Sequence, residues 1–203
     1  LGDDAVADLV IETDEGPSLI PAHPGLDTLD SDLGNIDDAR ERYTRLEQFL
    51  DDYVDPLDYD VVLIDLPGMT NNVTYNGLWA ARHAITPVEM GPFEAEQADA
   101  LRRDLEKIAD NFSVDIELSL VLPNKVDTRT NLAEEYLSSF ETEYSDSIAP
   151  DYVPYSQDIR NAAQRGSTAF DLENPSTTAQ AARDAYLAAA ETLMTRLEEK
   201  IHV

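Results

Sequence analysis

The sequence of 203 residues contains no cysteine, which excludes both a disulfide framework and a thiolate metal site. It has no apolar run that approaches the length of a transmembrane helix, and its first four residues carry no positive charge typical of a leader. Its three histidines, His23, His83 and His202, are far apart and have no histidine partner four residues away, so a histidine metal site is not indicated. These absences predict a soluble cytoplasmic protein that does not bind a membrane.

Positive charge is scarce. The chain has 42 acidic and 14 basic residues, for a net charge of −28, and only three of the basic residues are lysines. The acidic residues are spread between apolar segments rather than gathered in one block, which argues against a disordered acidic tail. At about 1 M salt the Debye length falls to about 3 Å, so repulsion between these charges is largely screened. We therefore expect a halophilic protein with little surface suited to broad nucleic-acid binding.

A short apolar segment that ends in a carboxylate is the most informative feature of the chain. Residues 61–64 are apolar and rich in β-branched side chains, Asp65 follows them, and a turn at Pro67 and Gly68 comes next. Such a run is typical of a strand buried on both faces of a parallel sheet, where ligands bind at the carboxyl ends of the strands. Asp65 is therefore a candidate for holding Mg²⁺, and Gly68 a candidate for approaching a phosphate.

Strand and helix patterns alternate along the whole chain. Strands are predicted at residues 18–22, 61–64, 84–88, 116–122 and 152–153. Helices are predicted at residues 36–52, 76–82, 93–112, 130–144, 158–165 and 176–200. This alternation predicts an α/β fold with a mostly parallel sheet flanked by helices.

Polar residues follow two more of these strands. Asn124, Lys125 and Asp127 come after the strand at 116–122, and residues 154–158 come after the strand at 152–153. Because the carboxyl ends of parallel strands meet at one edge of a sheet, we expect these two loops to converge with Asp65 around one ligand.

In order and spacing, these segments resemble the ParA/MinD (Soj-like) family of partition-type P-loop ATPases. The similarity covers nearly the whole chain, through residues 15–22, 59–68, 76–88, 159–166 and 181–193. It implies a P-loop NTPase fold of the SIMIBI class that binds ATP and Mg²⁺ and forms a homodimer. It further implies a dimer switch in DNA, plasmid or chromosome partitioning or in cargo positioning, with a partition adaptor protein as a partner.

The resemblance also assigns roles to individual residues. Asp65 matches the Walker B carboxylate, which holds Mg²⁺ through water, and Gly68 would offer its N–H to the γ-phosphate, so both are catalytic candidates. Residues 69–72 would be switch residues. Asn124 would read the edge of the base. The other nucleotide-binding candidates form the loop against the base and ribose: Pro154, Tyr155, Ser156 and Asp158.

The sequence departs from that family at the phosphate-binding loop. None of its eight glycines precedes a lysine, so the Gly-Lys-Ser/Thr sequence of a Walker A loop is absent. The family's first strand, first helix and second strand are absent as well. We interpret residues 1–203 as the C-terminal two-thirds of a single ParA-like nucleotide-binding domain and expect them to have no ATPase activity as they stand. The alternative is a relative that has lost catalysis.

A GTPase fits some of the same residues. Asp65-x-x-Gly68 and Asn124-Lys125-x-Asp127 match the paired motifs of GTPases, in which Asp127 would accept two hydrogen bonds from guanine. The turn at Pro67, the segment 159–166 and the closing helix favour the ATP-binding family.

A catalytically inactive scaffold that binds a partner protein around Met69 and Trp79 is the other alternative, although Trp79 also fits a core position. Arg160 and Arg165 lie in a region where members of the ParA/MinD family bind DNA nonspecifically. Two arginines in so acidic a chain give little support to DNA binding, and their place near the end of a helix fits charge complementarity with its C-terminus.

Overall fold

A computed structural model describes residues 9–13 and 16–201. These described residues form two compact units, which divide between Arg82 and His83. No helix among the residues with described positions is both long and apolar enough to cross a membrane.

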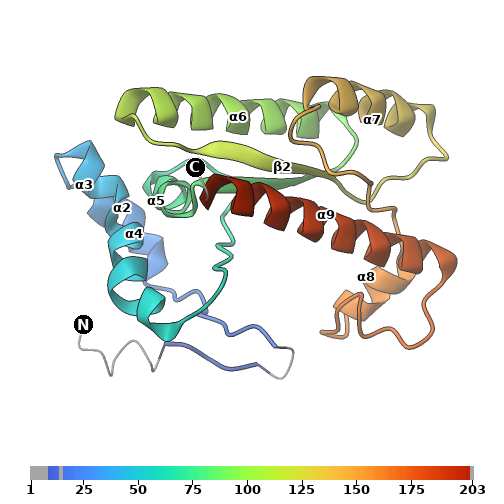
Figure 1. The fold of residues 1–203 in the computed structure, drawn as a ribbon, viewed down its shortest axis with the longest axis horizontal. Helices are drawn as coiled ribbons and strands as arrows, with labels where there is room; N and C mark the ends of the chain where they lie inside the picture. The colour runs from blue at the N-terminus through green and yellow to red at the C-terminus, as the bar shows by residue number, and fades with distance from the viewer. Residues whose placement is uncertain (1–8, 14–15, 202–203) are drawn as a thin grey trace. The chain divides into compact units, whose positions relative to one another are not determined.

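The second unit is built on two parallel strands. β1 (His83–Val88) pairs with β2 (Glu117–Pro123), with His83 opposite Glu117, Val88 opposite Pro123 and one irregularity between Ala84 and Ile85. Helix α6 (Pro92–Phe112) connects the strands, as a parallel crossover requires. Figure 1 shows α6 along one face of the sheet and α9 (Thr177–Ile201) along the other. The predicted parallel sheet flanked by helices is confirmed.

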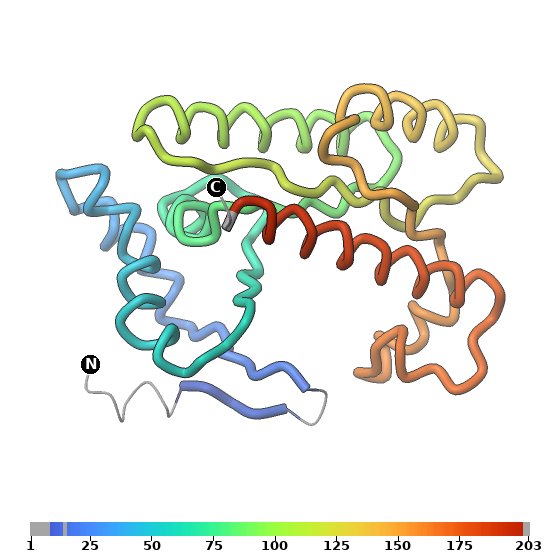
Figure 2. Tube along the Cα trace, in the orientation of Figure 1, coloured from blue at the N-terminus to red at the C-terminus, as the bar shows by residue number. Residues whose placement is uncertain are grey.

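The remaining helices of this unit also match the prediction. They are α7 (Asn131–Glu143) and α8 (Gln157–Ala163). Figure 2 shows the chain leaving α8, turning and returning along the sheet as α9. The strand predicted at 152–153 is wrong, because neither residue belongs to a strand and the chain here forms only an isolated parallel bridge, between Val126 and the next residue, Pro154. The N–H of Val153 donates to the carbonyl of Pro123 and the carbonyl of Val153 accepts from the N–H of Val126, and the left-handed turn at Lys125 interrupts the ladder between these two bonds.

Side chains of β2 alternate between two apolar clusters, as the period of a strand requires. One cluster lies toward α9, whose alanines allow the helix to approach the sheet closely. Its buried members are Leu120, Leu122, Ala149, Val153, Ala182, Ala185 and Ala189. The other lies toward α6 and α7 and contains Val88, Ala98, Val121, Phe140 and Tyr144.

The first unit is mainly helical. Its elements are α2 (Leu26–Gly34), α3 (Ala39–Tyr43), α4 (Arg45–Phe49), a π-helical turn η1 (Leu50–Val54), a 3₁₀ turn η2 (Asp55–Leu57) and α5 (Asn72–Ala81). The helix predicted near 76–82 is confirmed and begins earlier, where Asn71 caps α5 by accepting from the N–H of Thr74 at 2.8 Å. Helix α2 was not predicted.

The helix predicted at 36–52 is divided into α3 and α4. At the division the side-chain amide of Asn76 takes the place of a helical hydrogen bond. Its Nδ2 donates to the carbonyl of Arg42 at 3.0 Å, and its Oδ1 accepts from the N–H of Leu46 at 3.2 Å. In a continuous helix these two backbone groups would bond to each other, so their separation breaks the helix.

Two predicted strands of the first unit are wrong. Residues 18–22 contribute only a single antiparallel bridge between Ile11 and Leu19. Residues 61–64 form no strand, and the side chain of Leu63 is 79% exposed. A strand is stabilised by pairing with its neighbours, and the part of the chain that the structure describes provides no ladder partner for 61–64.

Trp79 lies in the core of the first unit and is only 1% exposed. Its Nε1 donates to Glu47 Oε2 at 3.0 Å, and Glu47 also pairs with Arg82. The guanidinium groups of Arg40 and Arg82 lie 5.5 and 5.0 Å from the centroid of the indole ring. The core position expected for Trp79 is confirmed.

Candidate functional site

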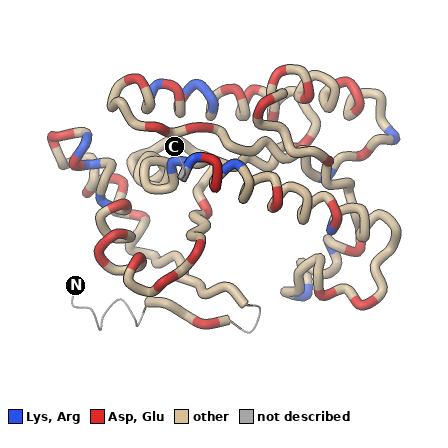
Figure 3. Tube along the Cα trace, viewed as in Figure 1, with Lys and Arg blue, Asp and Glu red and all other residues tan. Residues whose placement is uncertain are grey.

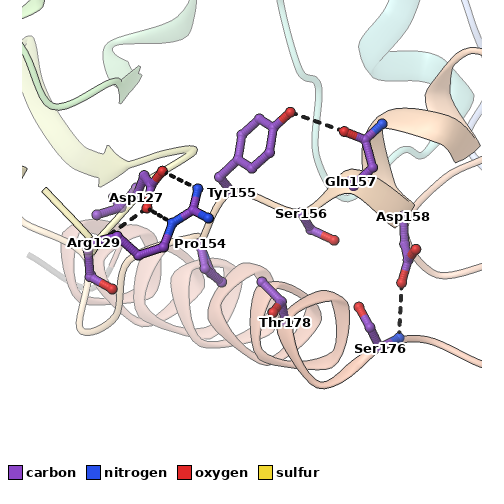
Figure 4. A pocket seen from close by; sticks show the side chains of 11 residues that line it. Asp127, Arg129, Pro154, Tyr155, Ser156, Gln157, Asp158, Ser176 and Thr178 are labelled. Atoms are coloured by element: carbon purple, nitrogen blue, oxygen red, sulfur yellow. Dashed lines mark hydrogen bonds and ion pairs between the residues drawn. The ribbon is translucent and has the colours of Figure 1, made fainter.

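A polar pocket of about 470 Å³ lies in the second unit, where the loops after β2 and before α8 meet the start of α9 (Figure 4). Two short segments, residues 126–129 and 154–158, form most of its wall, and Ser176 and Thr178 complete it. The loop residues predicted to bind a base and ribose, Pro154, Tyr155, Ser156 and Asp158, all line this pocket. Asp127, the residue of the GTPase alternative, lines it as well.

Backbone hydrogen bonds hold the two loops side by side. The N–H of Val126 donates to the carbonyl of Val153 at 3.0 Å, and the N–H of Tyr155 donates to the carbonyl of Val126 at 3.0 Å. Lys125, just before this contact, has a left-handed backbone with φ of 52°, which turns the chain out of the strand. The pocket therefore begins where the sheet ends, as expected for a parallel sheet.

Asp127 and Arg129 form a close ion pair on one wall of the pocket. Arg129 Nε donates to Asp127 Oδ1 at 2.7 Å and Nη2 donates to Oδ2 at 2.6 Å, so the contact is bidentate. The backbone N–H of Arg129 also donates to Oδ1 at 3.2 Å. These hydrogen bonds lower the pKa of Asp127 to about 2. Asp127 is therefore a carboxylate at neutral pH, with both oxygens engaged.

Asp158 connects the start of α8 to the start of α9 on another wall. Its Oδ2 accepts from the N–H of Ser176 at 3.1 Å, and Ser176 Oγ in turn accepts from the N–H of Ala179 at 3.3 Å. Hydrogen bonds from the side chain and backbone of Ser176 lower the pKa of Asp158. The carboxylate thus fixes the end of α9 that borders the pocket.

Ser156 brings a buried hydroxyl to the pocket wall. The residue is 8% exposed, and its Oγ has no hydrogen-bond partner within the part of the chain with described positions. The hydroxyl does not cap α8, although Ser156 occupies the N-cap position. A buried hydroxyl without a partner costs free energy, so a ligand that bonds to it would recover that cost.

Tyr155 is 39% exposed and presents its ring to the pocket (Figure 4). The hydroxyl at the tip of the ring donates to Gln157 Oε1 at 3.3 Å and accepts from Arg160 Nη1 at 3.4 Å. These bonds hold the ring by its edge and leave it suited to stacking against a planar group.

Asn124 does not line this pocket. Its Oδ1 accepts from the N–H of Lys125 at 3.0 Å and lies 3.5 Å from the hydroxyl of Tyr186, on α9. Its backbone N–H donates to the carbonyl of Val88 at 2.8 Å. Asn124 is therefore fixed at the end of β2, beside the pocket, and its predicted contact with a base stays a prediction.

Asp65 and Gly68 belong to the first unit and are exposed, just after the segment 61–64 that is predicted as a strand. No side-chain or backbone group crowds Gly68, since a Cβ built there meets no atom within 4 Å. Their roles with Mg²⁺ and the γ-phosphate, and their convergence with the second unit's loops, stay predictions. Among the residues described, no group of three or more His, Asp or Glu side chains could hold a metal by itself.

The partner surface predicted around Met69 and Trp79 is not available in full. Met69 is 63% exposed, whereas Trp79 is covered by its own unit. A partner could therefore reach Met69 but not the indole ring.

Comparison with known proteins identifies the family. A family model described as an AAA domain, AAA_31, matches residues 1–118. The chain belongs to this family. It is 26% identical to the chromosome partitioning protein ParA of Caulobacter vibrioides, over 98% of this chain and 73% of that protein. It is also 26% identical to the chromosome-partitioning ATPase Soj of Treponema pallidum, over 64% of this chain and 50% of that protein.

Solved structures with bound nucleotide share the α/β fold of this AAA_31 domain. The complex of Cyanothece McdA(D38A) with ATP matches with a TM-score of 0.72, at 16% identity, over 90% of this chain and 70% of that one. Cobyrinic acid a,c-diamide synthase from Mycobacterium smegmatis, with bound ADP and magnesium, matches with a TM-score of 0.62, at 24% identity, over 78% of this chain and 66% of that one. The predicted ParA/MinD resemblance and the α/β P-loop NTPase fold are both confirmed.

Sequence reasoning missed several residues of the pocket in this AAA_31 domain. Arg129 was not singled out, and neither were Ser176 and Thr178 at the start of α9. For Arg129 a signal was present, because an acidic and a basic residue two positions apart precede the helix cap at Thr130. For Ser176 and Thr178 no local signal existed, since only the return of α9 brings them to the pocket.

Proposed function

We propose that this AAA_31 domain carries the base- and ribose-binding part of the nucleotide site of a ParA-like partition ATPase. The observation that supports it most directly is the pocket, because it joins the loop at 154–158 to the loop after β2, at the carboxyl end of that parallel strand. Residues 1–203 would form part of a single ParA-like nucleotide-binding domain.

The chemistry of the pocket suits a nucleoside. The exposed ring of Tyr155 offers a stacking surface for a base, and the hydroxyl of Ser156 offers a hydrogen bond to a ribose hydroxyl or a base edge. Asp158 is ionised at neutral pH and could accept from a ribose hydroxyl. Only the base and ribose would be held by these groups, so the phosphates need donors from elsewhere.

The proposal includes the ATP and Mg²⁺ that the family resemblance implies. Asp65 would hold Mg²⁺ through water and Gly68 would donate its N–H to the γ-phosphate, while ATP supplies the phosphoryl group whose hydrolysis drives the switch. The functional form would be a homodimer that acts with a partition adaptor protein, in DNA, plasmid or chromosome partitioning or in cargo positioning. Relatives named as chromosome partitioning proteins support this class of function.

Titration with AMP tests the pocket. Two-dimensional ¹H–¹⁵N NMR in about 1 M KCl, where surface charges are screened, should show saturable shifts at residues 126–129 and 155–158. Ribose 5-phosphate, which lacks the base, should shift Tyr155 much less. The variant Y155A should weaken AMP binding, whereas Y59A, which removes an exposed tyrosine of the first unit, should not. Shifts confined to other residues, or none at millimolar AMP, would refute the proposed pocket.

A fluorescent ATP analogue with Mg²⁺ tests the role of the missing loop. Residues 1–203 contain no Gly-Lys-Ser/Thr sequence, so we expect weak binding of the triphosphate and no hydrolysis by this chain. Tight, magnesium-dependent binding would contradict that expectation and would require another phosphate-binding group.

GTP is the second candidate ligand, because Asp127 lines the pocket in the position of the guanine-reading carboxylate of the GTPase motif. The engagement of both Asp127 oxygens by Arg129 supports ATP instead, since guanine would need those oxygens.

A further inference from the structure

Arg129 occupies Asp127, one of the two carboxylates that line the pocket and the one that matches the guanine-reading position of the GTPase motif. Its guanidinium holds both oxygens of Asp127, at 2.7 and 2.6 Å, and the two side chains lie together on the wall of the pocket (Figure 4). The side chain of Arg129 is 82% exposed, so this contact is not a by-product of core packing.

The position of Arg129 is set by the turn that begins α7. Thr130 caps this helix by accepting from the N–H of Ala133 at 3.3 Å. The N–H and hydroxyl of Thr130 donate to the carbonyl of Asp127 at 3.2 and 3.1 Å, and the N–H of Arg129 donates to the Asp127 carboxylate. Residues 127–130 therefore form a hydrogen-bonded turn, which places the Arg129 side chain beside the carboxylate of Asp127.

The two purines make opposite demands on a carboxylate. Guanine presents two neighbouring donors, the N1–H and the 2-amino group, which match the two oxygens of a free carboxylate. Adenine presents an acceptor at N1, which a free carboxylate would repel. When an arginine binds a carboxylate, the positive guanidinium compensates the negative charge. The oxygens that accept from the arginine are then no longer free to accept from guanine.

We propose that Arg129 is a base-specificity residue, which excludes guanine from the pocket by occupying Asp127 and so makes the pocket selective for adenine. This inference rests on the proposed nucleotide function. Arg129 acts through Asp127 and is therefore a positioning residue for the carboxylate, not a group that must touch the base.

Selectivity can be measured on the whole chain with three nucleoside monophosphates. AMP, GMP and IMP are titrated separately and followed by the backbone amide NMR signals of residues 126–129 and 155–158. In the unchanged chain AMP should bind more tightly than GMP. In R129A the ratio of GMP to AMP affinity should rise about tenfold, the effect of a charge-assisted hydrogen bond. IMP, which lacks the 2-amino group, should gain less than GMP.

Matched variants separate this role from a loss of structure or of charge. R129Q keeps part of the side-chain stem and should reproduce the gain. R103A removes an arginine from the exposed surface of α6, outside the pocket, and should leave the affinity ratio unchanged. In D127N/R129A the gain should disappear, because the amide of asparagine cannot accept from both guanine donors.

The outcomes distinguish the two proposals. If AMP shifts the pocket residues but the GMP to AMP ratio changes by less than about twofold in both R129A and R129Q, the specificity role is wrong and the nucleotide site stands. If no nucleotide shifts the pocket residues of the unchanged chain, the proposed function fails and the specificity role falls with it.

Discussion

Tyr144, at the end of α7, shows how one side chain links the two helices on one face of the sheet. It is 3% exposed, and its hydroxyl donates to Asp99 Oδ1, on α6, at 3.1 Å. Arg102 binds the same carboxylate at 2.8 Å and lies 5.4 Å from the centroid of the Tyr144 ring. Burial, together with the nearby Asp99 charge, raises the pKa of Tyr144 to about 12.

We predict that Tyr144 makes stability fall at high pH. In the unfolded chain a tyrosine ionises near pH 10, whereas folded Tyr144 stays neutral to about 12. Its contribution is therefore complete below about pH 10 and is lost as the pH rises through 12. Y144F should lower the free energy of unfolding by about 1 kcal/mol at neutral pH and flatten this dependence.

Urea unfolding between pH 8 and pH 12 measures this effect, with the pH values chosen on either side of the ordinary tyrosine range. Y136F, on the same helix, is the control, because Tyr136 packs beside the cluster of Tyr144 without sharing its carboxylate. An equal response of Y144F and Y136F would show that the hydroxyl of Tyr144 contributes nothing specific.

At the scale of residues, the sequence indicates where site groups lie but not what they contact. The spacing after each strand predicted that Asp127 and residues 154–158 lie at a sheet end, and they share one pocket. The sequence could not predict that Asn124 meets Tyr186, because these residues are 62 positions apart and come together only when α9 packs on the sheet. The buried, unpaired hydroxyl of Ser156 likewise depends on packing around it.

Helix α9 packs on the sheet through a row of small side chains. Ala182, Ala185 and Ala189 are 0%, 3% and 4% exposed and contact Leu120 and Leu122 of β2. Their spacing of three and four residues places them on one face of the helix. Because protein interiors are closely packed, a larger side chain on this buried face would crowd the sheet.

We predict that A182L lowers the free energy of unfolding by about 1–3 kcal/mol, because a larger side chain must displace the helix or the sheet. A181L adds the same atoms at the neighbouring, exposed position and should change stability by less than about 0.5 kcal/mol. Urea denaturation followed by circular dichroism gives both values. Similar losses in the two variants would mean that the alanine face is not tightly packed.

Residues 61–64 show why a strand pattern can fail. The four apolar residues fit a strand buried on both faces, yet the segment is irregular and Val61, Val62 and Leu63 are exposed. A strand prediction from an apolar pattern assumes that neighbouring strands are present to pair with the segment. The sequence of the segment itself does not show whether such strands exist. The division of α3 from α4 by Asn76 has a similar cause, since the amide that breaks the helix lies 30 residues away from Leu46.

Hydrogen exchange distinguishes the exposed segment from the sheet. We predict that the amides of residues 61–64 exchange at close to the rate of an unfolded chain, because no ladder bond protects them within the described structure. The amides of β2 that lie in buried residues, such as Val121, should exchange far more slowly. Equal protection of 61–64 and β2 would show that the segment is paired in solution.

At the scale of the whole molecule, negative charge is distributed over both units of the fold. Acidic positions recur along the helices of each unit instead of forming one block (Figure 3). Several of the few cations are already paired with carboxylates, including Lys125 with Glu89 and Lys200 with Glu117. Most of the acidic side chains therefore have no basic partner, and their negative charges repel one another.

We predict that KCl stabilises this protein. Raising KCl from about 0.1 M to about 2 M shortens the Debye length from about 10 Å to below 3 Å and weakens this repulsion. A gain of about 2 kcal/mol would raise the melting temperature by about 4–8 °C for a chain of this size. Thermal unfolding followed by circular dichroism measures the shift, with sucrose as a control for effects that do not depend on ionic strength. A constant or falling melting temperature would contradict the expected halophilic character.

Trp79 gives the protein an intrinsic optical label. It is the only tryptophan in the sequence, and its indole is enclosed by Glu47, Arg40 and Arg82, all within residues 1–82. Its emission therefore follows the melting of that unit alone, whereas most of the ellipticity at 222 nm comes from the helices of the other unit, of which α6 and α9 are the longest. Comparing the midpoints of the two signals in one denaturation experiment reveals whether the two halves of this polypeptide lose their structure together or one after the other.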